Sequence, residues 1–196
     1  MTAKAKRRRP RTKIAGMPLH PGTHVVGPES GTMQVMTYRE GMAQKVGHDL
    51  VLDVSGWQAR VTVGEDRAPT TIELDVDPRS LQVREGKHGV KPLSDGDRDE
   101  IRKNIDEKVL RGQPIEFRSR EVSGREGALK VNGELTIAGQ TRPAGFELEL
   151  NDYGELSGTL TIVQSQWDIK PYRALMGALK VRDAVEIALE VRLPAD

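Results

Sequence analysis

The sequence predicts an all-β protein, an antiparallel eight-stranded β-barrel with one main amphipathic helix. The first observation behind this prediction is an alternation of apolar and polar residues with a period of two. It recurs along the chain from residue 31 and is typical of strands with one buried face. The second is a single segment, residues 94–110, in which the apolar spacing becomes helical. A closed barrel is preferred to a sandwich because closure removes the sheet edges, although alternation alone does not decide between them.

The clearest strand pair lies in residues 129–150, LKVNGELTIAGQTRPAGFELEL. The alternation is interrupted at 138–143, where Gly139 tolerates positive φ and Pro143 stops a ladder. This predicts a β-hairpin whose loop is slightly longer than the tight two-residue types. Gly133, inside the first strand, predicts a bulge or a sharp bend.

Further strands are expected on both sides of this hairpin. Residues 48–64 form either one long strand with a bulge or two strands at a corner. Residues 168–180 are irregular, with a single helical turn predicted near 171–177. The remaining alternating segments are 33–38, 70–77, 115–119, 155–164 and 185–191.

The main helix is predicted at about 95–110. Ser94 and Asp97 have the spacing of a capping box, and the first turns are acidic, as the helix dipole favours. Gly112 and Pro114 end the helix. Four apolar residues share one face of it: Ile101, Ile105, Val109 and Leu110.

Composition limits both the core and the chemistry. Aromatic residues make up only 4% of the chain, so the core must consist mainly of Val, Ile and Leu. The absence of cysteine excludes disulfides, thiolate-bound metals and thiol catalysis. No apolar stretch is long enough to cross a bilayer, and no secretory signal is recognisable. We therefore expect a cytoplasmic protein.

Charge divides the chain into two parts. Residues 1–13 hold seven Lys or Arg and no acid, so the remainder carries a net charge of −6. We expect residues 1–28 to be a basic, Pro/Gly-rich, flexible tail and residues 29–196 to form the barrel domain. The tail is either a solvated terminus or a weak contact for nucleic acid or anionic membrane. The first is favoured because no aromatic residues interleave with the charges.

No catalytic or metal-binding pattern is present. Nucleophile motifs such as G-x-S-x-G and phosphate-cradling glycine loops are absent. His20 and His24 are four residues apart, but Pro21 and Gly22 prevent the helix that would align them. The sequence therefore predicts no enzymatic activity, no cofactor and no metal ion.

Three segments resemble a known family. PIEFRS at 114–119 and GELTIAGQTRP at 133–143 are similar to the P-x-I-x-F-x-S and G-x-L-T-I-x-G-x-T-[KR]-P segments of the YceI-like, polyisoprenoid-binding family. VRDAVEI at 181–187 looks like that family's last strand. The resemblance covers about residues 70–192. The family's aromatic-D-x-x-H-S motif is not evident, and residues 171–177 differ from its R-x-D-F-G segment.

The resemblance implies a lipocalin-like barrel with an elongated apolar cavity. Such a cavity would hold an isoprenoid chain, polyprenyl or quinone-like, or a related amphiphile, without catalysis. A homodimer is a further expectation. The alternative is an interaction module whose basic arm binds polyanions while the barrel is a scaffold, and deleting residues 1–13 would distinguish the two.

The candidate ligand-binding residues are of three kinds. Inward aliphatic and aromatic residues line the cavity or, alternatively, pack a filled core: Leu52, Leu74, Phe117, Leu135, Phe146, Ile162 and Ile187. Loop residues form a lid over the barrel mouth, unless Trp167 anchors the loop in the core: Trp167, Tyr172, Leu175 and Met176. Two inward polar residues bond a head group or satisfy one another: Ser119 and Gln164.

Overall fold

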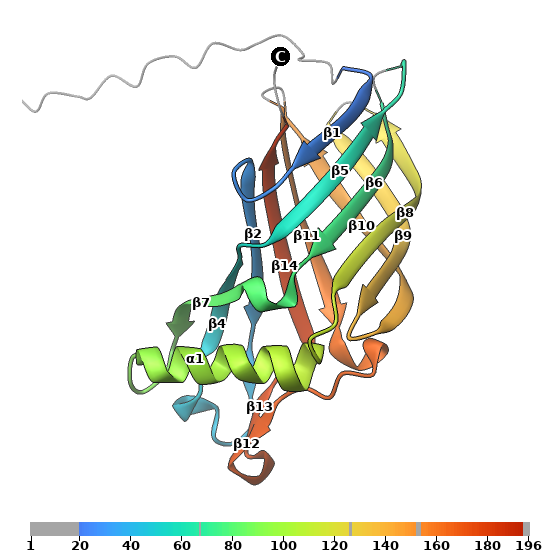
Figure 1. Ribbon diagram of the computed structural model, residues 1–196. Helices are drawn as coiled ribbons and strands as arrows, with labels where there is room; N and C mark the ends of the chain where they lie inside the picture. The colour runs from blue at the N-terminus through green and yellow to red at the C-terminus, as the bar shows by residue number, and fades with distance from the viewer. Residues whose placement is uncertain (1–19, 67, 126, 152–153, 194–196) are drawn as a thin grey trace, which may run out of the picture.

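The main body is a curled antiparallel sheet of eleven strands (Figure 1). The computed structural model describes residues 20–66, 68–125, 127–151 and 154–193, without the side chain of Arg125. The strand order is β1-β5-β6-β8-β9-β10-β11-β14-β2-β4-β7. The strands are β1 Gly22–Val26, β2 Gly31–Thr37, β4 Asp49–Val54, β5 Trp57–Val63, β6 Pro69–Val76, β7 Leu81–Lys87, β8 Ile115–Arg125, β9 Ala128–Ile137, β10 Gln140–Leu150, β11 Glu155–Val163 and β14 Ala184–Arg192.

The all-β antiparallel fold with one helix is confirmed, but the eight-strand count is not. β1 and β7 stand at the two ends of the order. Within the described part of the chain they are not paired with each other, so the sheet is a half-barrel with two edges. A second, three-stranded sheet extends beyond one end of it (Figure 1). Its strands are β3 Arg39–Glu40, β12 Arg173–Ala174 and β13 Leu179–Val181.

Period-two burial is clearest in β9, where every second residue from Leu129 to Ile137 is buried. The segment 48–64 forms two strands at a corner, because the chain turns between β4 and β5 at Ser55 and Gly56. The bulge expected at Gly133 lies on the neighbouring strand. The register of β8 shifts between Ser119 and Glu121, opposite Gly133.

The loop of the 129–150 hairpin is shorter than predicted. β9 and β10 are joined by Ala138 and Gly139 alone, with φ of 51° and 78°. Two successive positive φ values are the signature of a type I′ turn. Pro143 is paired with Glu134 inside β10. It is tolerated because it falls at a non-hydrogen-bonded position, where its nitrogen faces away from β9.

The chain enters the sheet earlier than predicted. β1 pairs with β5 along its whole length, and Val26 is buried, so residues 22–26 belong to the barrel and not to the tail. Two apolar residues flanked by Pro and Gly gave too little periodicity to reveal this strand. The predicted basic arm, residues 1–13, lies outside the described residues.

The helix is where the sequence predicts it. α1 Asp95–Asn104 continues as a π-helical segment, η3 Ile105–Leu110. The capping box is confirmed, since Ser94 Oγ accepts from the amide of Asp97 and Asp97 Oδ2 accepts from the amide of Ser94. The remaining elements are short 3-10 helices: η1 Gln44–Val46, η2 Pro78–Ser80, η4 Gln164–Trp167 and η5 Leu175–Gly177.

One arginine fastens the helix to an exposed sheet edge. Arg98 Nη1 donates to the carbonyl oxygens of Val83 and Arg84 on β7, at 2.7 and 3.2 Å. An edge strand offers unpaired carbonyls, and a guanidinium satisfies them strongly. As a result α1 lies across one end of the half-barrel (Figure 1).

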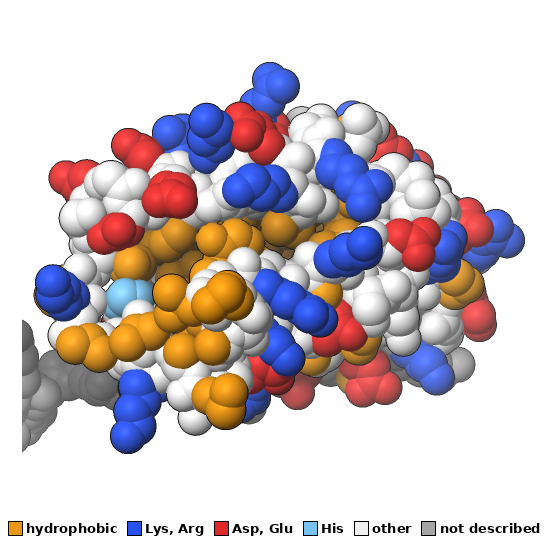
Figure 2. All heavy atoms as spheres, turned by 90° about the horizontal axis from the view of Figure 1, so that it is seen from below, with side chains coloured by type: hydrophobic (Ala, Val, Ile, Leu, Met, Phe, Trp, Pro, Cys, Tyr) orange, Lys and Arg blue, Asp and Glu red, His pale blue; other side chains and the backbone are white. Residues whose placement is uncertain are grey.

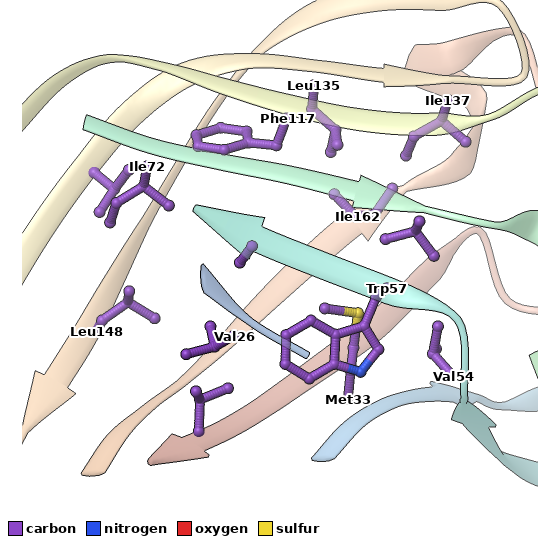
Figure 3. Close-up of a cluster of buried hydrophobic side chains, with 14 of the residues drawn as sticks. Val26, Met33, Val54, Trp57, Ile72, Phe117, Leu135, Ile137, Leu148 and Ile162 are labelled. Carbon is purple, nitrogen blue, oxygen red and sulfur yellow. The ribbon is translucent and has the colours of Figure 1, made fainter. Parts of the chain in front are cut away.

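The interior of the barrel is filled at the end away from the helix. Val26, Trp57, Phe117, Leu148 and Val191 are each no more than 5% exposed. Figure 3 shows side chains of this cluster pointing from several strands toward one another. The rings of Phe117 and Phe146 lie 5.1 Å apart. We call this part of the interior the packed end.

Candidate functional site

The other end of the barrel interior is hollow. A cavity of about 620 Å³ lies between α1 and the inner face of the sheet. Seen from below, it is a depression lined by hydrophobic side chains (Figure 2). We call this part of the interior the hollow end, and its opening, beside the three-stranded sheet, the mouth.

The helix forms one wall of the cavity. Ile101, Ile105 and Val109 all line it, and all three are only half-buried. An apolar helix face packed on a filled core would be covered. These side chains instead face unfilled space, which shows that the cavity is part of the fold and not a defect in one strand.

The opposite wall comes from the sheet. Leu50 and Leu52 of β4 and Val185 and Ile187 of β14 line the cavity in register with the alternation of their strands. Leu179 and Val181 of β13 carry the lining outward to the mouth. Aliphatic residues of further strands complete this wall, among them Val35 of β2 and Ile162 of β11.

Polar groups gather at the mouth. Arg39, His48, Lys91 and Lys180 line it there. His48 Nε2 donates to Lys91 O at 2.7 Å, and Arg39 Nη1 donates to Gly47 O at 3.1 Å. These bonds hold the loops that border the opening.

Asp49 links the same loops. Its Oδ1 accepts from the amide of Arg39 at 2.8 Å, and its Oδ2 lies 2.9 Å from His88 Nδ1. Burial alone would raise the pKa of Asp49, but the bonds from Arg39 and His88 outweigh it and hold the pKa below its ordinary value of 3.8. Asp49 is therefore a carboxylate near neutral pH and tethers β3 to the loop after β7.

Five predicted ligand-binding residues line the cavity. Gln164 is 7% exposed, and its Nε2 donates to Arg182 O at 2.9 Å. Tyr172 is 38% exposed at the mouth. The five are Leu52, Ile162, Gln164, Tyr172 and Ile187.

The other predicted residues do not line the cavity. Trp167 is 3% exposed and donates from Nε1 to Leu135 O at 3.0 Å, so it anchors its loop in the core and is not part of a lid. Ser119 Oγ accepts from the amide of Ile72 at 2.8 Å, where the bulge interrupts the ladder, and does not pair with Gln164. Leu175 and Met176 project into solvent. The remaining four belong to the packed end or its border: Leu74, Phe117, Leu135 and Phe146.

The sequence prediction missed the whole helix wall. Ile101, Ile105 and Val109 were recognised as an apolar helix face but not as part of the site. The available signal was that the single apolar helix face of an all-β protein has to cover some part of the sheet. Leu50 and Val185 were also missed, although each is in phase with a predicted residue of its own strand. Val35 was missed as well, and it is the cross-strand partner of Leu52 and Ile187.

The chemistry of the cavity follows from the groups that line it. Across the described residues, no three His, Asp or Glu side chains are grouped closely enough for a metal ion. Among these same residues, no helix has the length and apolar character needed to span a bilayer. What the lining offers is aliphatic contact in the interior and hydrogen-bonding or charged groups at the opening.

Comparison with known proteins identifies the family. Burkholderia cenocepacia BcnA has a similar structure, with a TM-score of 0.60, 14% sequence identity, and coverage of 83% of this chain and 96% of that one. The Campylobacter jejuni YceI protein has a TM-score of 0.51, 12% identity, and coverage of 73% and 84%. No curated protein sequence matches the chain. The profile of the YceI-like domain matches residues 33–193, and this chain therefore belongs to the YceI-like family.

Proposed function

We propose that this protein binds and carries an isoprenoid or other long-chain amphiphile, polyprenyl or quinone-like, in the cavity under α1. The observation that carries the proposal is the half-buried aliphatic face of Ile101, Ile105 and Val109, which looks onto unfilled space. Leaving apolar surface in contact with water is unfavourable by about 25 cal/mol per Å². A ligand that covers this surface regains that free energy.

The size and chemistry of the cavity fit such a ligand. At about 620 Å³ it falls within the range of roughly 300–1,000 Å³ typical of small-molecule sites. Its interior is aliphatic, which suits a saturated or isoprenoid chain but offers no pattern of polar groups for a sugar or nucleotide. Membership of the YceI-like family adds support.

The distribution of polar groups sets the orientation of the ligand. The apolar chain lies inward, between α1 and β14, and the polar head lies at the mouth. There, Lys91 and Lys180 can pair with an anionic or hydroxyl head group, and Tyr172 can cover the first carbons of the chain. Among the described residues, Gln164 is the one buried polar residue on the inner lining that can bond a polar atom further along the chain.

The proposal is for a binding protein and not for an enzyme. In the described part of the cavity lining, Ser94 Oγ donates to Asp97 Oδ2 at 2.6 Å, but Ser94 Oγ also accepts from the amide of Asp97, so this pair serves as the cap of α1 and is not proposed as a nucleophile with its base. The cytoplasmic location and the homodimer stay predictions. The interaction-module alternative depends on residues 1–13, and its test is the loss of polyanion binding when these residues are deleted.

Organic extraction and native mass spectrometry of the purified full chain test the proposal. We expect either a co-purified lipid or stoichiometric uptake of a fluorescent polyprenyl probe. Finding no bound lipid and no uptake of the probe would contradict it.

A further inference from the structure

Exposed apolar side chains are concentrated around the mouth. The described residues include seven exposed large hydrophobic side chains, and only Val25 lies elsewhere, on β1. The others fall in three segments that border the opening, 42–46, 87–91 and 170–180, which we call the mouth collar. They are Met42, Val46, Val90, Tyr172, Leu175 and Met176.

The mouth collar is also uniformly basic. Its three segments contain no Asp or Glu. They carry six basic residues: Lys45, Lys87, Lys91, Lys170, Arg173 and Lys180. Beside the collar, exposed Glu40 is paired with Lys180 across β3 and β13, and Glu85 lies 3.5 Å from Lys87. Further acidic residues lie on the other side of the mouth, in the first turns of α1, among them Asp95 and Asp99. One side of the opening thus combines protruding apolar side chains with positive charge.

The tip of the mouth collar is held in an unfavourable backbone conformation. Leu175 and Met176 have φ of 51° and 54°, in the left-handed region that L-residues other than Asn and Asp rarely adopt. The turn directs both side chains outward, and they are 58% and 108% exposed. Neither burial nor local backbone preference accounts for this arrangement, but an external apolar partner would.

We propose that the mouth collar docks on an anionic phospholipid surface. Met42, Leu175 and Met176 insert among the acyl chains, while the lysines and arginines contact the phosphates, the combination that gives interfacial binding. A second copy of the chain is a poorer partner, because it would bring two predominantly basic surfaces together. The acidic start of α1 tilts the molecule so that the collar side meets the surface.

This inference deepens the proposed function, because the cavity then opens directly onto the layer that holds its ligand. An apolar ligand passes between membrane and cavity without crossing water. Docking itself does not require the cavity to be loaded, so the two proposals can fail independently.

Vesicle flotation of the full chain tests the docking. We expect the wild type to float with vesicles of equimolar phosphatidylcholine and phosphatidylglycerol, and much less with phosphatidylcholine alone. Leu175→Asn combined with Met176→Asn keeps the turn, because Asn tolerates left-handed φ. It should lower vesicle binding roughly tenfold or more. Val25→Thr, at an exposed apolar residue outside the collar, should not change it.

Three results would overturn the docking. The double variant could float to the same extent as the wild type, which would assign vesicle binding to the basic arm, residues 1–13. The wild type could remain in the aqueous phase. The wild type could form a dimer that the double variant loses while vesicle binding is unchanged, which would make the mouth collar an interface between two copies.

A second measurement does not depend on the double variant. Since the chain has no cysteine, Met176→Cys carries a single environment-sensitive fluorophore. Its emission should shift to the blue with the anionic vesicles, while the same label at Val25→Cys should not respond.

Uptake of a water-dispersed short-chain isoprenoid probe, measured without vesicles, should be equal in the double variant and the wild type. If neither protein takes up the probe, the carrier function is refuted but the docking is not.

Discussion

Val185 and Val191 lie six residues apart on one face of β14, yet their surroundings differ. Val191, at the packed end, is 4% exposed and meets the side chains of other strands. Val185, at the hollow end, borders the cavity. At the packed end the curled sheet faces itself. At the hollow end the opposite wall is α1, held at the β7 edge by Arg98, and its side chains do not reach across. The wall opposite a strand therefore decides whether inward residues fill the core or line a cavity.

The largest expected effect comes from truncating one leucine at each end. Leu148→Ala at the packed end should lower the free energy of unfolding by about 2–5 kcal/mol, because it leaves a void among buried neighbours. Leu50→Ala at the hollow end should cost about 1 kcal/mol, because its side chain already borders open space. Urea unfolding of both variants measures the difference. Equal costs would mean that the hollow end is as tightly packed as the other.

Replacing a valine by tryptophan should also distinguish the two ends. The loss of stability should again be larger at the packed end. Val191→Trp should destabilise the fold by about 1–3 kcal/mol or more through overpacking. Val185→Trp places the same ring in the cavity and should change stability by less than about 1 kcal/mol. Thermal unfolding of the two variants is the measurement. A large loss of stability in Val185→Trp would show that the cavity cannot accept the tryptophan ring.

The helix wall can be loosened without touching the cavity lining. Arg98→Ala removes two charge-assisted hydrogen bonds to β7 and should cost about 1.5 kcal/mol. Arg102 pairs only with Asp99 on the helix surface among the described residues, so Arg102→Ala should cost no more than about 0.5 kcal/mol. Hydrogen exchange of the α1 amides should also speed up in the first variant alone. Equal losses of stability and equal exchange rates in the two variants would show that Arg98 does not hold α1 in place.

The smallest effect concerns Asp49 at the mouth. Its pKa is lowered in the folded state, so its contribution to stability is complete above the unfolded value near 3.8 and is lost as the pH falls through the folded pKa. Asp49→Asn should therefore be less stable than the wild type by about 0.5 kcal/mol near neutral pH. The difference should vanish in acid. Urea unfolding over this pH range checks the sign, and a difference that grows toward low pH would contradict it.

The sequence predicts which segments form strands and the helix better than it predicts how far along the barrel each inward residue lies. Alternation correctly identified β9, β10 and β14, and the capping box located α1. It missed β1 and β7, because each has only two apolar residues, too few to reveal a period. It also misjudged the 138–139 turn, because Ala138 adopts a φ that alanine rarely takes.

The candidate site shows the same limit. Phe117 and Ile187 are both inward by phase, but nothing local in the sequence says that one lies at the packed end and the other at the hollow end. That distinction depends on where α1 crosses the sheet. Leu175 and Met176 were predicted to form part of a lid, but their outward direction is set by two positive φ values that composition does not reveal.

Uptake of a fluorescent polyprenyl probe by Val185→Trp, beside wild type and the cavity-distant Val25→Thr, tests the central claim most directly. We expect the wild type and Val25→Thr to bind the probe with equal affinity. Val185→Trp should remain folded and bind at least about tenfold more weakly, because its ring occupies the space of the chain. Undiminished uptake by a folded Val185→Trp would place the ligand elsewhere and contradict the account.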